Sequence, residues 1–243
     1  MEITFTNSIG TEHIFPPEPA SKNIPEWYKN MESYPDGIKK PSGAGTTTAT
    51  IKKCMPVFDA MTSGYIIKSQ ADVYVSQKDV YGIDEKTGDE VFITKQPYYE
   101  WAEFNLIKFH PSLQAPDHPN RNNHLEYPKW QNPWAIKTPK GYSCIITNPL
   151  HRDSIFTILT GVVDTDKYST MVNFPFVLND INFEGLIPAG TPIAQIIPFK
   201  RDDWKMRIGN EKDIIDMKKT DLRVQSRFFD AYKDNFRSSK VYK

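Results

Sequence analysis

The pattern of apolar and polar positions is clearest over residues 134–201. Four apolar runs rich in β-branched residues follow one another there, separated by Pro, Gly, Asn and Asp. Such runs are typical of consecutive strands in an antiparallel sheet. The last run, which follows the P-A-G-T turn at 188–191, is apolar at nearly every position, and this predicts a strand covered on both faces. The sequence therefore predicts a mainly β protein, an antiparallel β-sandwich of jelly-roll type.

Shorter elements are predicted upstream. Residues 2–6 alternate between apolar and polar and indicate a short strand. Pro25 suits the first turn of a short helix that Ser21 or Asn23 caps, and a second short helix fits between Pro56 and Gly64. A strand over 64–76, the turn D-E-K-T-G-D-E and the returning run E-V-F-I-T-K then predict a hairpin.

The segment 97–133 is rich in aromatic residues, histidine and proline. We expect it to be irregular, and two interpretations remain open. It is either an ordered arm that packs its aromatic side chains over a sheet face, or a functional connection, since long irregular connections often carry function.

Near the C-terminus the pattern changes from strand to helix. The β region is expected to end near residue 209, and a charged linker follows it. From Thr220 onward, Leu222, Phe229 and Phe236 recur every seven residues, which predicts an amphipathic helix of about four turns. The predicted organisation is therefore one β-sandwich domain at 45–208, an N-terminal arm with a short helix at 1–44, and the linker and helix at 209–243.

Composition narrows the classes of function. Of the 243 residues 39% are hydrophobic, which indicates a folded globule, and the 30 basic residues balance the 30 acidic ones. Because there is no net field to attract polyanions, neither nucleic acid nor a membrane surface is an expected partner. The N-terminus lacks the pattern of a signal peptide and no run is long enough to span a bilayer, so we expect a soluble protein in the cytoplasm. Cys54 and Cys144 are expected to be buried free thiols.

Nucleotide-binding and hydrolase signatures are absent, so no organic cofactor is predicted. The chain contains no GxxxxGK[ST], GxGxxG, GxSxG or HExxH pattern. A divalent metal is the one cofactor considered further.

Histidines near carboxylates are the candidates for that metal. His151 and Asp153 have the H-x-D spacing that places two ligands on one side of a strand end, as in metal-dependent jelly-roll oxygenases. No histidine follows His151, although such sites need a later one. His110, His118 and His124 could supply imidazoles from the 97–133 segment, but ordinary surface or hydrogen-bonded histidines explain them equally.

Asp164 belongs to a D-T-D sequence after a predicted strand and allows two interpretations. Two carboxylates two residues apart could hold a hard cation. Alternatively, the sequence is an Asp-rich turn whose side chains bind the backbone, and this interpretation is favoured.

The strand blocks carry a resemblance to a known family. The blocks G-Y-S-C-I-I-T-N-P, L-T-G-V-V-D-T-D, V-N-F-P-F-V-L and I-P-A-G-T-P-I-A-Q-I-I-P-F-K-R, with I-P-E-W-Y-K upstream, resemble an uncharacterised family of phage and bacterial proteins. This resemblance implies a phage-type protein and assigns no catalytic residue. The run A-G-T-P-I-A-Q-I-I alone is similar to the dUTPase and dCTP-deaminase fold, which we interpret as shared β geometry.

Two functional hypotheses follow. The first is a non-enzymatic phage-type protein that acts by binding or assembly, with self-association through the C-terminal helix, in the host cytoplasm or as a component of the virion. The second is a metal-dependent small-molecule enzyme with a jelly-roll pocket, similar to cupins and 2-oxoglutarate oxygenases, that uses the histidines and carboxylates named above.

Overall fold

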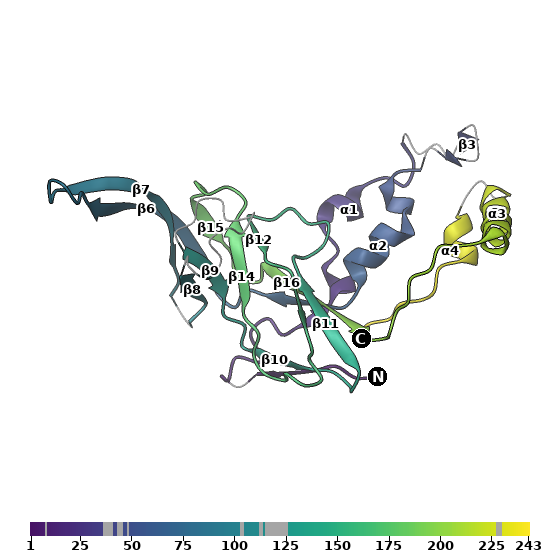
Figure 1. Cartoon of the computed structure of the whole chain (residues 1–243), viewed down its shortest axis with the longest axis horizontal. Coiled ribbons are helices and arrows are strands. Elements are labelled where there is room, and N and C mark those ends of the chain that lie inside the picture. Colours follow the sequence, from purple (N-terminus) through teal and green to yellow (C-terminus); the bar gives the residue numbers. More distant parts are fainter. Residues whose placement is uncertain are drawn as a thin grey trace. The chain divides into compact units, whose positions relative to one another are not determined.

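The computed structural model describes residues 1–7, 9–35, 41–42, 46–47, 49–102, 105–111, 114, 126–226 and 230–243. Over these residues the chain is mainly β and forms two compact units (Figure 1). The first consists of residues 1–18 and 64–200, and the second of residues 19–63 and 201–243. The predicted boundaries at 44/45 and 208/209 stay a prediction.

Antiparallel sheets make up the first unit. The largest has the order β13 (Gly161–Val163), β11 (Tyr142–Thr147), β16 (Pro192–Lys200), β5 (Tyr65–Lys68), with the short β2 (Glu18–Pro19) after β5 at the point where the chain leaves the unit. The second has the order β12 (Phe156–Ile158), β14 (Phe174–Leu178), β9 (Glu126–Trp130), β8 (Ile107–Pro111). The third contains β15 (Gly185–Ile187), β6 (Val73–Ile83) and β7 (Glu90–Glu100), and β1 (Thr4–Asn7) pairs with β10 (Trp134–Lys137). The predicted class, mainly β with antiparallel sheets, is confirmed.

One hydrophobic core joins these sheets. It contains side chains from every sheet of the unit, including the fully buried Ile136, Phe176 and Ile196. An aromatic cluster lies in it, in which Trp130 stacks on Phe176 with ring centroids 5.2 Å apart and Phe156 contacts both rings. The aromatic cluster joins β9, β12 and β14 and so fixes the second sheet on the core.

The turn before β16 forms as its sequence predicts. Gly190 has a φ of 81°, a left-handed conformation that glycine adopts without steric cost. Its backbone N–H donates to the carbonyl oxygen of Ser69 at 2.8 Å, and Ser69 N–H donates to Thr191. The turn is thereby bound to the end of β5, which pairs with β16.

The second unit is mainly helical. It contains the short turns η1 (Ala20–Asn23) and η3 (Ile51–Lys53), the helices α1 (Glu26–Asn30), α2 (Met55–Thr62), α3 (Glu211–Gln225) and α4 (Ala231–Asn235), and the two-residue strands β3 (Pro41–Ser42) and β4 (Thr46–Thr47). Tyr28 of α1 is buried against Phe58 of α2 and donates its hydroxyl to the Lys52 carbonyl. No helix among the described residues is long and apolar enough to span a membrane.

Ion pairs connect α2 to the C-terminal residues of this unit. The Asp59 carboxylate accepts hydrogen bonds from Arg237 at 2.6 Å and from the Lys240 ammonium at 2.8 Å. The Arg237 guanidinium also lies over the Phe58 ring. These hydrogen bonds, the one from Arg237 above all, hold the pKa of Asp59 below its usual value, although burial opposes them.

Several predicted elements need correction. The single strand expected over 64–76 is two strands, because residues 69–72 leave the sheet to bind the turn before β16. The irregular segment 97–133 contains the end of β7 and all of β8 and β9. Proline does not break these strands, because Pro111 lies at the end of the edge strand β8 and Pro128 pairs with Phe109.

The C-terminal prediction is wrong in its bounds. The β region ends at Lys200 rather than near 209, and the helix begins at Glu211 rather than at Thr220. Asn210 caps this helix in a box with Asp213, which satisfies the first free backbone N–H groups, so the charged residues expected to form a linker are helical. Phe229 lies outside the described residues.

The prediction for the first helix is right in place and wrong in its cap. Helix α1 begins at Glu26 directly after Pro25, and no side chain caps it. Ser21 and Asn23 belong to the separate turn η1, so neither stands at the N-cap position.

Candidate functional site

The β6–β7 hairpin extends from the first unit as a long two-stranded arm (Figure 1). Its turn is well formed. The Asp84 carboxylate accepts from Lys86 N–H at 2.8 Å, and Gly88, at a φ of 74°, donates its N–H to the Asp84 carbonyl. The hydrogen-bonded turn therefore fixes the register of the whole arm.

The end of this arm, residues 80–94, is apolar on both faces, and we call it the hairpin tip. Tyr81 pairs with Phe92, their rings in edge-to-face contact at 5.9 Å. The opposite face carries Val91, which pairs with Gly82, and Ile93, whose side chain lies against Gly82. These side chains are exposed, Phe92 by 55% and Ile93 by 58%. A strand pair that is apolar on both faces is normally covered on both.

The backbone edges of the tip are open as well. β15 pairs with β6 only at residues 73–75, and no described strand pairs with the outer edge of β7. Natural proteins usually block such an edge, since its free N–H and C=O groups can pair with another chain. The tip therefore has the properties of a protein-binding surface.

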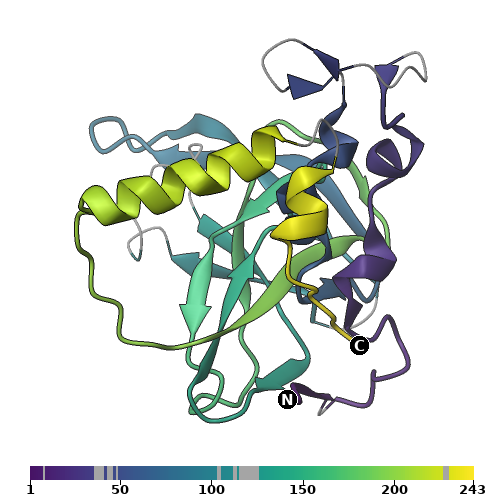
Figure 2. The same ribbon diagram turned by 90° about the vertical axis from the view of Figure 1, so that its right-hand side faces the viewer.

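The second unit also exposes apolar residues. Residues 201–210 form an extended segment that leads into α3 (Figure 2), and Trp204, Met206 and Ile208 on it are each about nine-tenths exposed, at 89%, 94% and 91%. No residue of α3 is buried. Its apolar residues fall on one half of the helix circumference and are listed here: Ile214, Ile215, Met217, Leu222 and Val224.

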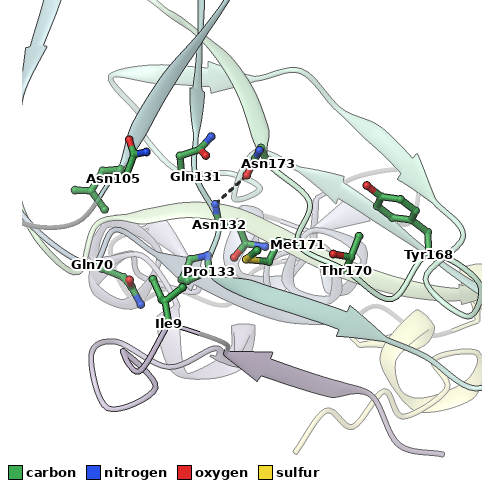
Figure 3. A pocket seen from close by; sticks show the side chains of 11 residues that line it. Ile9, Gln70, Asn105, Gln131, Asn132, Pro133, Tyr168, Thr170, Met171 and Asn173 are labelled. Carbon is green, nitrogen blue, oxygen red and sulfur yellow. Dashed lines mark hydrogen bonds between the residues drawn. The ribbon is translucent and has the colours of Figure 1, made fainter.

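A pocket of about 310 Å³ lies in the first unit, among loops that join the strands (Figure 3). Loops before β8, between β9 and β10, and between β13 and β14 form most of it. Its described lining residues carry no charge: Ile9, Gln70, Asn105, Leu106, Gln131, Asn132, Pro133, Tyr168, Thr170, Met171 and Asn173. The volume is at the lower end of the range for small-molecule sites.

Hydrogen bonds fix two of the carboxamides in this pocket. Asn132 donates to the Trp134 carbonyl at 2.7 Å and accepts from its N–H at 3.1 Å. Gln70 accepts from the Thr11 hydroxyl at 3.1 Å. Both side chains are buried, so these parts of the wall are preorganised.

Gln131 is in a different state from these two. Its backbone N–H donates to the Leu106 carbonyl at 2.7 Å, which holds the residue in place. Its side-chain Nε2, however, is buried and has no hydrogen-bond partner among the described residues. An unpaired buried donor costs free energy that a bound acceptor would recover.

The predicted metal ligands are spread over several elements. His110 lies in β8, opposite Tyr127. His151, with a φ of 55°, and Asp153 lie in the loop between β11 and β12, and Asp164 follows β13. His118 and His124 lie outside the described residues. No three His, Cys, Asp or Glu side chains of the described part are grouped as metal ligands, and the metal site stays a prediction.

The D-T-D sequence has the contacts of a turn. The Asp164 carboxylate accepts from the Ser143 hydroxyl at 2.7 Å, and the Asp166 carboxylate accepts from Gly141 N–H at 2.8 Å. The Thr165 hydroxyl is buried and forms a hydrogen bond with Thr138. These contacts tie the residues after β13 to the β10–β11 connection, as expected for the turn interpretation.

Two residues of interest were missed from the sequence. Gln131 belongs to the segment expected to be irregular, where nothing in the pattern separates it from its neighbours. Arg152 was considered only as the spacer between two metal candidates. Its Nε and Nη2 are buried without a partner among the described residues, and burial lowers its pKa. Neither signal exists before the chain is folded.

Comparison with known proteins adds little. No family model matches the chain, and no curated protein matches it. A mutant dUTPase from phage phi11 of S. aureus aligns with 61% of this chain and 84% of its own, at 13% identity and a TM-score of 0.29. A mutant dUTPase of Staphylococcus bacteriophage 80alpha aligns with 61% of this chain and 76% of its own, at 13% identity and a TM-score of 0.28. Such a distant structural similarity to phage dUTPases carries no argument about function.

Proposed function

We propose that this is a non-enzymatic, phage-type protein that acts by binding and assembly, first of all with further copies of itself. The observation that carries the proposal is the hairpin tip, which is apolar on both faces and open at its edges. The phage assignment rests on the strand blocks quoted above, and with it the place of action, in the host cytoplasm or in the virion.

The energetics of the tip support a binding role. Burying a large apolar side chain is worth about 1.5–3 kcal/mol. Phe92, Ile93 and Ile83 are each more than half exposed, so the folded chain leaves most of this free energy unused. A partner that covers the tip would recover it, and that makes an apolar arm a source of affinity.

The charge balance supports a second copy as that partner. Association of identical chains is opposed when they carry a large net charge, and this chain carries none. The exposed half of α3 and the segment that leads to it offer each copy a second apolar surface. Homo-oligomers with closed symmetry are the commonest assemblies of soluble proteins.

A double substitution at the tip tests the proposal. Changing Phe92→Asp together with Ile93→Asp is expected to abolish self-association while leaving the free energy of unfolding within about 0.5 kcal/mol of wild type, because both side chains are exposed. Chemical cross-linking followed by denaturing electrophoresis measures the first effect, and urea denaturation the second.

The matched control is Val162→Asp, since Val162 is 64% exposed on β13, away from the arm. This variant is expected to cross-link like wild type. If the tip variant cross-links as efficiently as wild type and the Val162 variant, the hairpin tip is not the assembling surface.

A further inference from the structure

The pocket that contains Gln131 lies outside the assembling surfaces and carries an inference of its own. Its described lining is uncharged, its carboxamides are partly fixed, and one buried donor is unpaired. We infer that this pocket binds a small uncharged molecule that carries a carbonyl beside an apolar body, the class of the cyclic amides. This inference goes beyond the proposed function and does not depend on it.

Charge excludes the ionic classes of ligand first. None of the described lining residues is Asp, Glu, Lys, Arg or His. A charged ligand would lose its hydration on entering and find no opposite charge, which is expensive. The ligand that fits is therefore neutral.

Size sets the second condition. A water molecule occupies about 30 Å³ of liquid, so the 310 Å³ of the pocket correspond to about ten waters. A single ring with one or two polar groups is of this size. Leu106, Pro133 and Met171 provide the apolar contact for its body.

The polar groups set the third condition. Gln131 Nε2 needs an acceptor, and a carbonyl oxygen is the commonest one. The Asn105 carboxamide and the Thr170 hydroxyl line the same pocket and are able to accept from a ligand N–H. In Figure 3 Asn105, Gln131 and Asn173 lie along one side of the pocket, and Ile9, Gln70 and Pro133 along the other. A ring with a carbonyl and an adjacent N–H thus satisfies the donor and uses the acceptors.

Backbone contacts hold this arrangement together without a ligand. Asn132 N–H donates to Asn173 Oδ1 at 3.3 Å, and Ala135 pairs with Met171 in an isolated bridge. Both contacts join the loop before β10 to the loop before β14. The wall that carries Gln131 is therefore fixed on two sides, which limits the entropy lost on binding.

Ligand-observed NMR titration of the full-length protein tests the inference with defined probes. We expect δ-valerolactam, a neutral cyclic amide, to bind in the millimolar range. Fluorobenzene, which has a ring but no carbonyl, and pyroglutamate, a lactam with a carboxylate, are expected to bind at least about tenfold more weakly, a difference of about 1.4 kcal/mol. Equal binding of lactam and fluorobenzene, or no binding of the lactam, would overturn the inference without any variant.

Variants place the site. Gln131→Met keeps the length of the side chain and removes the donor, and it is expected to weaken lactam binding about tenfold while fluorobenzene binding stays unchanged. The matched control is Gln114→Met, at an exposed glutamine that does not line the pocket. Lactam binding that is the same in both variants would overturn the role of Gln131, and with it the assigned ligand class.

Discussion

Changing Gly64→Ala is expected to destabilise the first unit by about 4 kcal/mol or more, which is at the upper end for single substitutions. A Cβ atom at this position would lie 1.9 Å from the carbonyl oxygen of Ile196 and 2.9 Å from its carbonyl carbon. Ile196 belongs to β16, which pairs with β11 on one side and β5 on the other, so its backbone has no room to shift. Gly64 also has a φ of 72°, which an alanine adopts only with strain.

Gly141→Ala separates the two causes. Gly141 has a φ of 87°, but no atom lies within 4 Å of the place where its Cβ would be. This variant is therefore expected to lose only the backbone strain, about 1 kcal/mol. Urea denaturation followed by circular dichroism compares the two variants. Equal losses would mean that Gly64 does not approach β16 as closely as described.

The second large effect is expected in the other unit, on changing Asp59→Asn. Asp59 is buried and binds Arg237 and Lys240 at the same time. Removing one partner of a buried ion pair leaves an uncompensated charge and costs about 3 kcal/mol or more. We expect the lower end of this range, because Arg237 keeps some access to water, its side chain being 23% exposed.

Limited proteolysis localises this loss. Because Asp59 anchors residues 237 and 240 to α2, trypsin is expected to cleave at Arg237 and Lys240 sooner in the variant than in wild type. Asp216→Ala is the control, since its pair with Lys219 is exposed and is worth less than about 1 kcal/mol. Unchanged cleavage and stability in the Asp59 variant would show that the ion pairs do not hold the C-terminal residues.

The pH dependence of stability should carry the same signature. The folded-state pKa of Asp59 is lowered, first by the hydrogen bond from Arg237 and then by Lys240. Its contribution is therefore fully present above the unfolded aspartate pKa of about 3.9, and is lost as the pH falls through the lower folded value. The Asp59→Asn variant is expected to lose less stability than wild type over this acidic range.

The sequence was most informative where local chemistry decides the structure. The strands of residues 134–200, the turn at Gly190 and the β6–β7 hairpin follow from apolar runs and from residues that prefer turns. The start of α3 was also readable, because Asn210 and Asp213 have the spacing of a capping box. There, the density of charged residues was given too much weight against the cap.

Long-range contacts explain what the sequence could not predict. Asp59 and Arg237 are 178 positions apart, and neither has a neighbour that indicates the other. The pocket likewise combines loops from Ile9 to Asn173, and whether the Gln131 donor is paired depends on all of them. The strands β8 and β9 were missed because proline was interpreted as a breaker, although it is tolerated at the positions that their pairing provides.

The exposed surfaces are a different case. The apolar residues of the hairpin tip are visible in E-V-F-I-T-K, but a buried strand would have the same sequence. Only the folded chain shows that both faces are uncovered. The self-association predicted for the C-terminal helix stays a prediction, to which the structure adds the hairpin tip as a further surface.

Sedimentation velocity of the unmodified full-length chain over a wide concentration range tests the central claim most directly. If the protein acts by assembly through its exposed apolar surfaces, the average mass should rise with concentration from that of a monomer to that of a defined oligomer. The tip variant with Phe92→Asp and Ile93→Asp should remain monomeric in the same range. A wild-type chain that sediments as a monomer at every concentration would contradict the account.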